Sequence, residues 1–162
     1  MQETAAGKEQ IKKFSIGAGI ALLLVISGGY YLNVAPILQL RSLKRALELV
    51  QKGANPGKIQ KEFQAAISYG SFGAREAREI MAGTARLVAA KEAFPPEERK
   101  KFLLAAIEEL KKEIADSPQD VGHYLLLAQL LRSGLLDPSS KKEAEVFLKK
   151  ALTISPAMQA IY

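Results

Sequence analysis

The 162-residue chain is 48% hydrophobic and 25% charged, which is typical of a folded protein and too apolar for a disordered one. It contains no cysteine, which excludes disulfides, thiolate metal ligands and a thiol nucleophile. The net charge of +6 invites a nucleic-acid partner, but the lysine pairs alternate with glutamates along helical patterns, so we expect solvated helix faces and no nucleic-acid binding.

The charge is distributed unevenly along the chain. Residues 14–40 carry no charge, whereas 20 of the 23 Lys/Arg and 15 of the 17 Asp/Glu lie from Arg41 onward. The mean hydropathy of zero therefore averages two unlike parts. We expect a basic polar N-terminal segment over residues 1–13, a transmembrane helix over residues 14–37 and a soluble helical domain over residues 38–162.

The expected transmembrane helix has the length and the flanks of a membrane span. Residues 14–34 are uncharged, and a helix of 21 residues extends about 30 Å, the thickness of the hydrocarbon core of a bilayer. Lys12 and Lys13 flank one end, and Tyr30 and Tyr31 lie near the other, where aromatic belts form. The lysines indicate that the N-terminus is inside and that the C-terminal domain is extracytoplasmic.

Two other interpretations of this stretch remain. A signal peptide would use the same lysines, an apolar core over residues 16–26 and cleavage at residues 27–29, but the apolar stretch continues to Leu40. A buried core helix is the second alternative, although the helices expected elsewhere are shorter and amphipathic. If the helix spans a membrane, Gly17 and Ala21 form a small-residue pair that could pack on another membrane helix of the same or a partner protein.

The remainder of the chain shows only helical periodicity. Apolar residues recur at helical spacing and are interrupted by turn-forming residues, and no segment alternates with a period of two. The pattern predicts an all-α domain, with a fifth helix that is apolar on most faces and therefore central, and a last helix beginning at Ser155-Pro156. The expected buried stripes are Leu40, Leu43, Leu47 and Val50; Ile59, Phe63, Ala66 and Ile67; Ala77, Ile80, Met81, Thr84 and Val88; Leu103, Ala106, Ile107, Leu110 and Ile114; Tyr124, Leu127, Ala128 and Leu131; and Ala144, Phe147, Leu148, Ala151 and Leu152.

These stripes indicate a repeat. The last two have the spacing of the two helices of a tetratricopeptide repeat, with a small residue at Ala151 and a closing Pro156. The preceding hairpin closes with Pro118 but has Glu113 at an expected small position, and the first hairpin has Ser71 in place of the proline. We predict an α-solenoid of about three antiparallel hairpins with a truncated last helix. A generic antiparallel helical bundle is the alternative.

Several short phrases resemble a known family when they are taken in order: Asn33-Val34-Ala35-Pro36, the run AAISYGSFG at residues 65–73, Glu76-Ala77-Arg78-Glu79 and Leu152-Thr153-Ile154-Ser155-Pro156. From about Lys8 to Tyr162 the chain resembles the C-terminal end of bacterial O-antigen ligase and polymerase family membrane proteins that carry tetratricopeptide repeats. The resemblance implies a cell-envelope protein whose relatives transfer or polymerise lipid-linked glycans at the outer face of the cytoplasmic membrane. The family's catalytic residues lie in a multi-span core, so no residue of this chain inherits a catalytic role.

The sequence shows no pattern of a catalytic or metal site. His123 is the single histidine, so we expect a packed or capping residue. The adjacent carboxylates of Glu97-Glu98 and of Glu108-Glu109 point to different helix faces and cannot form a paired-carboxylate site. We expect no catalytic, cofactor-binding or metal-binding residue, and no enzymatic activity in this chain.

Two functions fit these observations. The first is a membrane-tethered interaction and support module, the C-terminal region of an O-antigen ligase-like protein in envelope polysaccharide assembly, anchored by a single span in the cytoplasmic membrane. The alternative is a stand-alone membrane-anchored tetratricopeptide adaptor. In either case we expect the lipid bilayer as one partner and a protein or peptide on the repeat surface as another.

Overall fold

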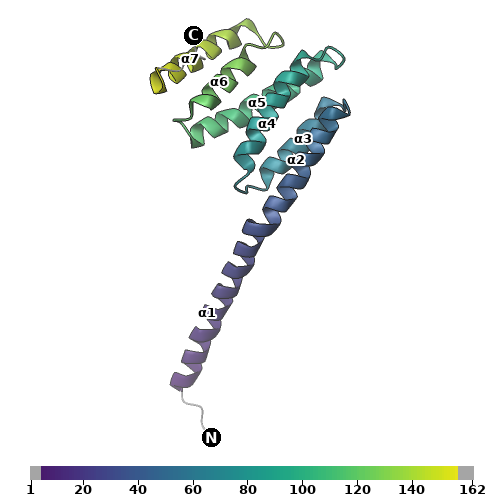
Figure 1. The fold of residues 1–162 in the computed structure, drawn as a ribbon. Helices are drawn as coiled ribbons and strands as arrows, with labels where there is room; N and C mark the ends of the chain where they lie inside the picture. Colours follow the sequence, from purple (N-terminus) through teal and green to yellow (C-terminus); the bar gives the residue numbers. More distant parts are fainter. Residues whose placement is uncertain (1–4, 157–162) are drawn as a thin grey trace.

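The computed structural model describes the backbone of residues 5–156 and the side chains of residues 17–156. Within this part the chain is helical and has no β-strand, which confirms the all-α prediction. The last helix expected from Ser155-Pro156 falls mostly on residues 157–162, outside the described part. The elements are α1 (Ala5–Gly29), the π-helical segment η1 (Tyr30–Val34), α2 (Ala35–Gln51), α3 (Pro56–Ser68), α4 (Ala74–Ala90), α5 (Pro96–Asp116), α6 (Val121–Leu131) and α7 (Pro138–Ile154), shown in Figure 1.

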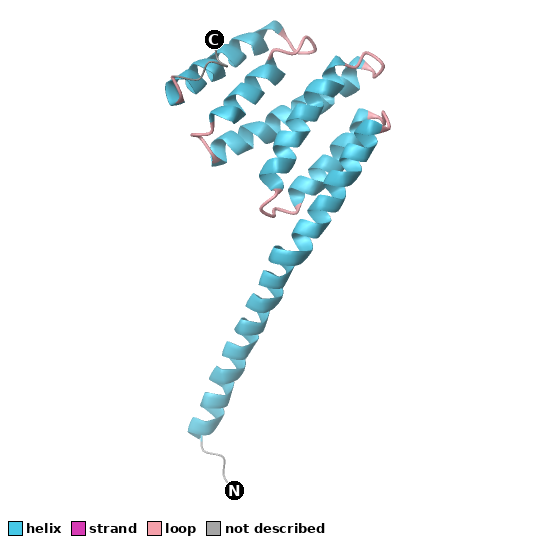
Figure 2. Ribbon diagram, in the orientation of Figure 1, coloured by secondary structure: helices cyan, strands magenta, loops and turns pink. Residues whose placement is uncertain are grey.

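The first three elements form one unbroken rod. Gly29 and Ala35, which flank η1, both have right-handed helical backbone angles, and the amide of Ala35 donates to the carbonyl of Tyr30. The side-chain amide of Asn33 also donates to the carbonyl of Gly29, at 3.2 Å. The π-helical turn thus changes the register of the helix without ending it. Figure 2 shows no loop between the apolar stretch and the helical domain. The boundary expected between residues 37 and 38 falls inside α2.

The rod is also the one helix in the described part that is long and apolar enough to cross a membrane. Only 11% of its most apolar window is buried in the protein. Side chains between Ile20 and Ile26 are exposed, for example Leu23 at 66% and Val25 at 71%. A core helix would be covered by the rest of the domain, whereas this helix presents a long apolar surface to its surroundings.

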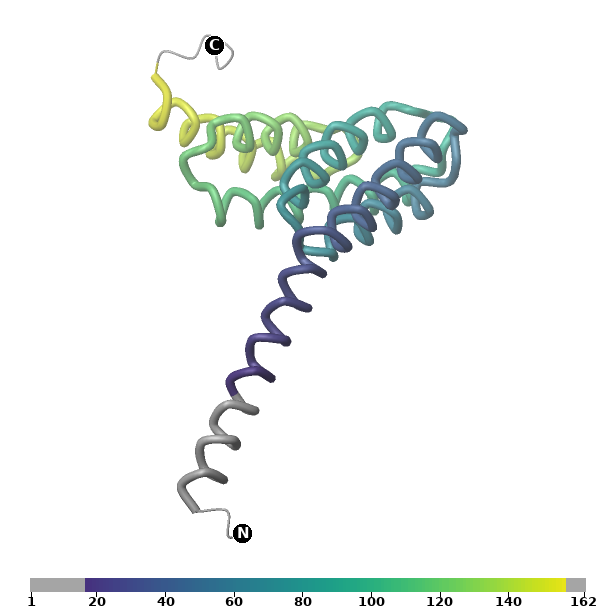
Figure 3. Tube along the Cα trace, turned by 60° about the horizontal axis from the view of Figure 1, so that its bottom comes forward, coloured from purple at the N-terminus to yellow at the C-terminus, as the bar shows by residue number. Residues whose placement is uncertain are grey.

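The helices from α2 onward form consecutive antiparallel hairpins. The closest pairs are α2 with α3, α4 with α5 and α6 with α7. The hairpins stand side by side, because α4 contacts both α3 and α6, and α3 also contacts α5 (Figure 3). The α3–α4 and α5–α6 turns lie at the end of the array nearer to α1, and the other three connections lie at the opposite end (Figure 1).

Local sequence chemistry sets the helix ends. Asn55 and Asp120 are N-caps, and their side chains accept hydrogen bonds from the amides of Gly57 and Gly122 at 2.8 and 2.9 Å. Prolines occupy the start of α3, α5 and α7, where a missing amide hydrogen costs nothing. Gly53, with φ of 65°, turns the chain after α2 in the left-handed conformation that glycine tolerates.

Most expected core stripes are buried, but in α2 only Leu43 and Val50 of the expected stripe pack partly buried against the core. In α3 and α5, Phe63 and Phe102 are fully buried and stacked, with ring centroids 6.3 Å apart. In α2, however, Leu40 is 63% exposed and Leu47 is 37% exposed. Ile80 of α4 is likewise exposed at 36%. The face of α2 that packs on the domain carries small or polar residues instead, which let the helices approach closely: Ala35, Pro36, Gln39, Ser42 and Ala46.

Candidate functional site

His123, the single histidine, lies at the start of α6 and is buried. Its Nε2 is 2.9 Å from Oε1 of Glu79 on α4. When Nε2 carries a hydrogen, it donates a hydrogen bond to that carboxylate. The histidine therefore joins the second hairpin to the third.

Arg75 extends this contact into an ionic cluster. Its Nε lies 3.1 Å from Oε1 of Glu79, and its guanidinium also pairs with Asp120, the N-cap of α6. The hydrogen bond with His123 lowers the pKa of Glu79 below its ordinary value, and Arg75 lowers it further against the opposing effect of burial. Oε1 of Glu79 is thus engaged by two side chains of the protein itself, which indicates a joint between helices rather than a free acid or base.

A second ionic cluster joins α4 to α5. Nη1 of Arg78 lies 2.7 Å from Oε2 of Glu113, and its Nε lies 3.2 Å from Oε2 of Glu109. Burial lowers the pKa of Arg78, but the hydrogen bonds to the two carboxylates outweigh it, so the pKa lies above its ordinary value. Glu113, which departs from the expected small residue of the repeat, is therefore a buried partner of this arginine.

The adjacent carboxylates separate as their sequence positions require. Glu98 accepts a hydrogen bond from the side-chain amide of Asn55 at 2.6 Å, whereas Glu97 is exposed. Glu109 pairs with Arg78, whereas Glu108 is exposed. Among residues 17–156 no group of three His, Cys, Asp or Glu side chains is placed to hold a metal ion.

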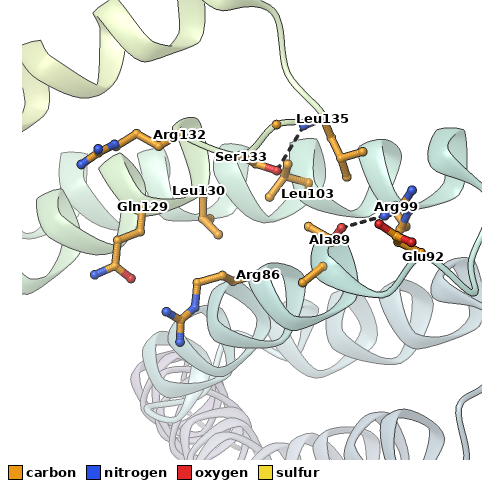
Figure 4. Close-up of a pocket in the computed structure, with 12 residues that line it drawn as sticks. Arg86, Ala89, Glu92, Arg99, Leu103, Gln129, Leu130, Arg132, Ser133 and Leu135 are labelled. Atoms are coloured by element: carbon orange, nitrogen blue, oxygen red, sulfur yellow. Dashed lines mark hydrogen bonds between the residues drawn. The ribbon is translucent and has the colours of Figure 1, made fainter.

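A groove of about 510 Å³ lies at the end of the array away from α1. It lies between the end of α4, the start of α5 and the segment that follows α6 (Figure 4). Leu103 and Leu130 are buried on its inner side, while Arg86, Gln129 and Arg132 are exposed at its edge. The groove thus combines an apolar base with a rim of three arginines and one carboxylate, that of Glu92.

The arginines of this groove do not converge on one point. Arg86 and Arg132 lie at one end of it and Arg99 lies at the other (Figure 4). Nη1 of Arg99 donates to the carbonyl of Ala89 at 2.9 Å, near the C-terminus of α4, where a cation offsets the helix dipole. A dispersed rim suits an extended polypeptide segment better than a single small anion.

Helical periodicity in the sequence does not predict this groove, because the groove is formed by residues of three helices that are tens of positions apart.

Comparison with protein-family models, with curated proteins and with solved structures finds no match to this chain.

Proposed function

We propose that the chain is a membrane-tethered helical-repeat module that supports partner binding in cell-envelope polysaccharide assembly. The observation that supports a membrane tether is the unbroken helix from Ala5 to Gln51. Its candidate span is apolar and exposed, and its last part is the first helix of the first hairpin. Exposure of apolar side chains to water is unfavourable, whereas the hydrocarbon core of a bilayer accommodates them. This surface is therefore stable when it lies in lipid.

A tetratricopeptide-like array is supported by the order and packing of the hairpins. Each hairpin contacts the next, as in a repeat protein whose units bury their faces on one another. Small residues are buried where helices meet, including Ala82 and Ala85 on α4 and Ala128 on α6. In the last hairpin Ala144 and Ala151 are buried on α7, at the positions expected of the second helix of a repeat.

The parent family rests on the sequence phrases that resemble O-antigen ligases and polymerases. In such a protein the module follows the last membrane helix, and the absence of a flexible linker makes the first hairpin move with that helix. The module then acts by positioning rather than by chemistry. Sequencing the gene upstream of Met1 tests this assignment, and a reading frame that encodes further hydrophobic spans is the expected result.

A stand-alone adaptor is the second candidate, and the groove beside Arg86, Arg99 and Arg132 is the observation that favours it. A groove with an apolar base and a rim of net positive charge can bind a segment that carries both apolar and acidic side chains. A genuine start codon at Met1, with no membrane spans encoded upstream, favours the adaptor over the ligase-like parent.

Membrane fractionation tests the tether that both candidates share. We expect the full chain to remain in the membrane pellet after alkaline carbonate extraction, and a fragment that begins at Ala35 to be soluble. The fragment must begin there, because Ala35, Pro36 and Gln39 are buried against the domain. Recovery of the intact chain in the soluble fraction contradicts the tether. A mature N-terminus near Tyr30 identifies a cleaved signal peptide instead.

A further inference from the structure

The turn between α3 and α4, residues 69–73, is held against the end of the uncharged stretch of the rod. The hydroxyl of Ser71 donates to Oε1 of Gln39, and both residues are buried. The backbone of Gly73 approaches so closely that a Cβ there would lie 3.1 Å from the same oxygen. These contacts hold the turn at the level of Gln39 along the rod.

That level corresponds to the surface of a membrane that the rod crosses. The 27 uncharged residues 14–40 form a helix of about 40 Å, the thickness of a bilayer with its headgroup layers. Gln39 lies five residues beyond Val34, about 7.5 Å past the end of the 30 Å apolar core segment. The first charged residue, Arg41, follows at once. A turn fixed beside Gln39 therefore lies in the headgroup layer.

The tip of the turn carries an exposed aromatic side chain. Phe72 is 78% exposed, the highest value among the large apolar residues of the described part. It borders a hollow of about 210 Å³ together with Pro36, Leu40 and Leu43. Leu40 and Ile37 are also exposed, so exposed apolar side chains continue along α2 from the end of the span to the hollow beside Phe72. Tryptophan and tyrosine concentrate at membrane interfaces, and phenylalanine is found with tryptophan and leucine on the lipid-facing side of helices that bind there.

We propose that the α3–α4 turn docks on the lipid headgroup layer of the membrane that α1 crosses, with Phe72 inserted among the lipids. The proposal rests on the membrane tether proposed above and goes beyond it, because it sets the orientation of the helical array. The occupant is lipid rather than a second protein, since the exposed surface is continuous with the span and lies at its end.

This orientation has a consequence for the groove at the other end of the array. α4 begins at the turn and ends at the groove, and its 17 residues extend about 25 Å. With Phe72 at the membrane, the groove beside Arg86, Arg99 and Arg132 opens away from the lipid. A partner can then reach the groove from the aqueous phase.

The absence of tryptophan from the chain allows a direct test. Single tryptophans are introduced into the full chain as Phe72→Trp, Leu23→Trp and Val146→Trp, at sites that are 78%, 66% and 64% exposed. Leu23 lies near the middle of the candidate span, and Val146 lies on α7, in the hairpin farthest from α2. Each variant is reconstituted into phosphatidylcholine–phosphatidylglycerol vesicles that contain lipids brominated near the headgroup or near the end of the acyl chain.

We expect headgroup-proximal bromine to quench Phe72→Trp more than chain-end bromine, with the reverse order for Leu23→Trp and no quenching of Val146→Trp. If Leu23→Trp is quenched and Phe72→Trp is not, the tether stands and the docking is wrong. If Phe72→Trp escapes lipid quenching and is also shielded from iodide, protein covers the turn, which also overturns the proposal. If Leu23→Trp is not quenched, the membrane tether itself fails and the docking fails with it.

Discussion

Replacing Arg78 with methionine is expected to destabilise the helical domain strongly. The side chain of Arg78 is 18% exposed, and it pairs with Glu113 and Glu109, which are 4% and 14% exposed. Methionine keeps much of the apolar stem but removes the partner of the buried Glu113, while Glu109 keeps its ion pair with Lys112. Removing one member of a buried pair costs about 3–5 kcal/mol, and the remaining exposure of Arg78 sets the expectation near 3 kcal/mol.

The assay is urea unfolding of the fragment that begins at Ala35, followed by helical circular dichroism. Arg75→Met is the matched control, because Arg75 also pairs with two carboxylates but its side chain is 46% exposed, so a much smaller loss is expected. The double variant Arg78→Met/Glu113→Leu should be more stable than Arg78→Met, because it removes one unpaired charge. Equal losses for the two arginine variants, or additive losses in the double variant, refute the buried pairing.

Three further predictions concern packing and pH. Ala151→Leu should cost about 1–3 kcal/mol in urea unfolding, because Ala151 is fully buried, whereas Lys150→Ala on the exposed face should change stability by less than about 0.5 kcal/mol; similar losses contradict this register of α7. Phe63→Ala should cost about 3–5 kcal/mol, and a small loss in thermal or urea unfolding means that the first two hairpins do not share this core. The pKa of Glu79 in the folded state lies below its ordinary value of 4.5. The contribution of Glu79 to stability is therefore fully present above pH 4.5 and is lost as the pH falls from 4.5 through the lowered pKa. Glu79→Gln should therefore lose less stability than the native chain over that acid range, and identical pH profiles contradict the pairing with His123.

The candidate functional site was only partly predictable. The packed position expected of the single histidine is confirmed, because the side chain of His123 is buried. It could not show that Arg78 pairs with Glu113, since that contact spans 35 positions and depends on how two helices cross. The groove near Leu130 was missed for the same reason.

The register of α2 shows where periodicity fails. Leu40 and Leu47 follow an apolar helical pattern, and burial was expected of them, yet the domain packs on the face that contains Ala35, Gln39 and Ala46. One face of α2 carries leucines and another carries small residues. Hydrophobicity alone predicts that the leucine face is the buried one. Close approach of α3 and of the α3–α4 turn selects the smaller side chains.

The sequence by itself determined the all-helical class, the helix ends and the single stretch long enough to cross a membrane, because these depend on local spacing, on proline and asparagine at helix starts and on a run of uncharged residues. Tertiary structure alone decided which face of each helix is covered, that the rod continues without a linker into the first hairpin, and that Phe72 lies beside the end of the uncharged stretch. These features depend on contacts between residues far apart in the chain, whose free energies are set by shape and by pairing rather than by the local pattern of apolar residues.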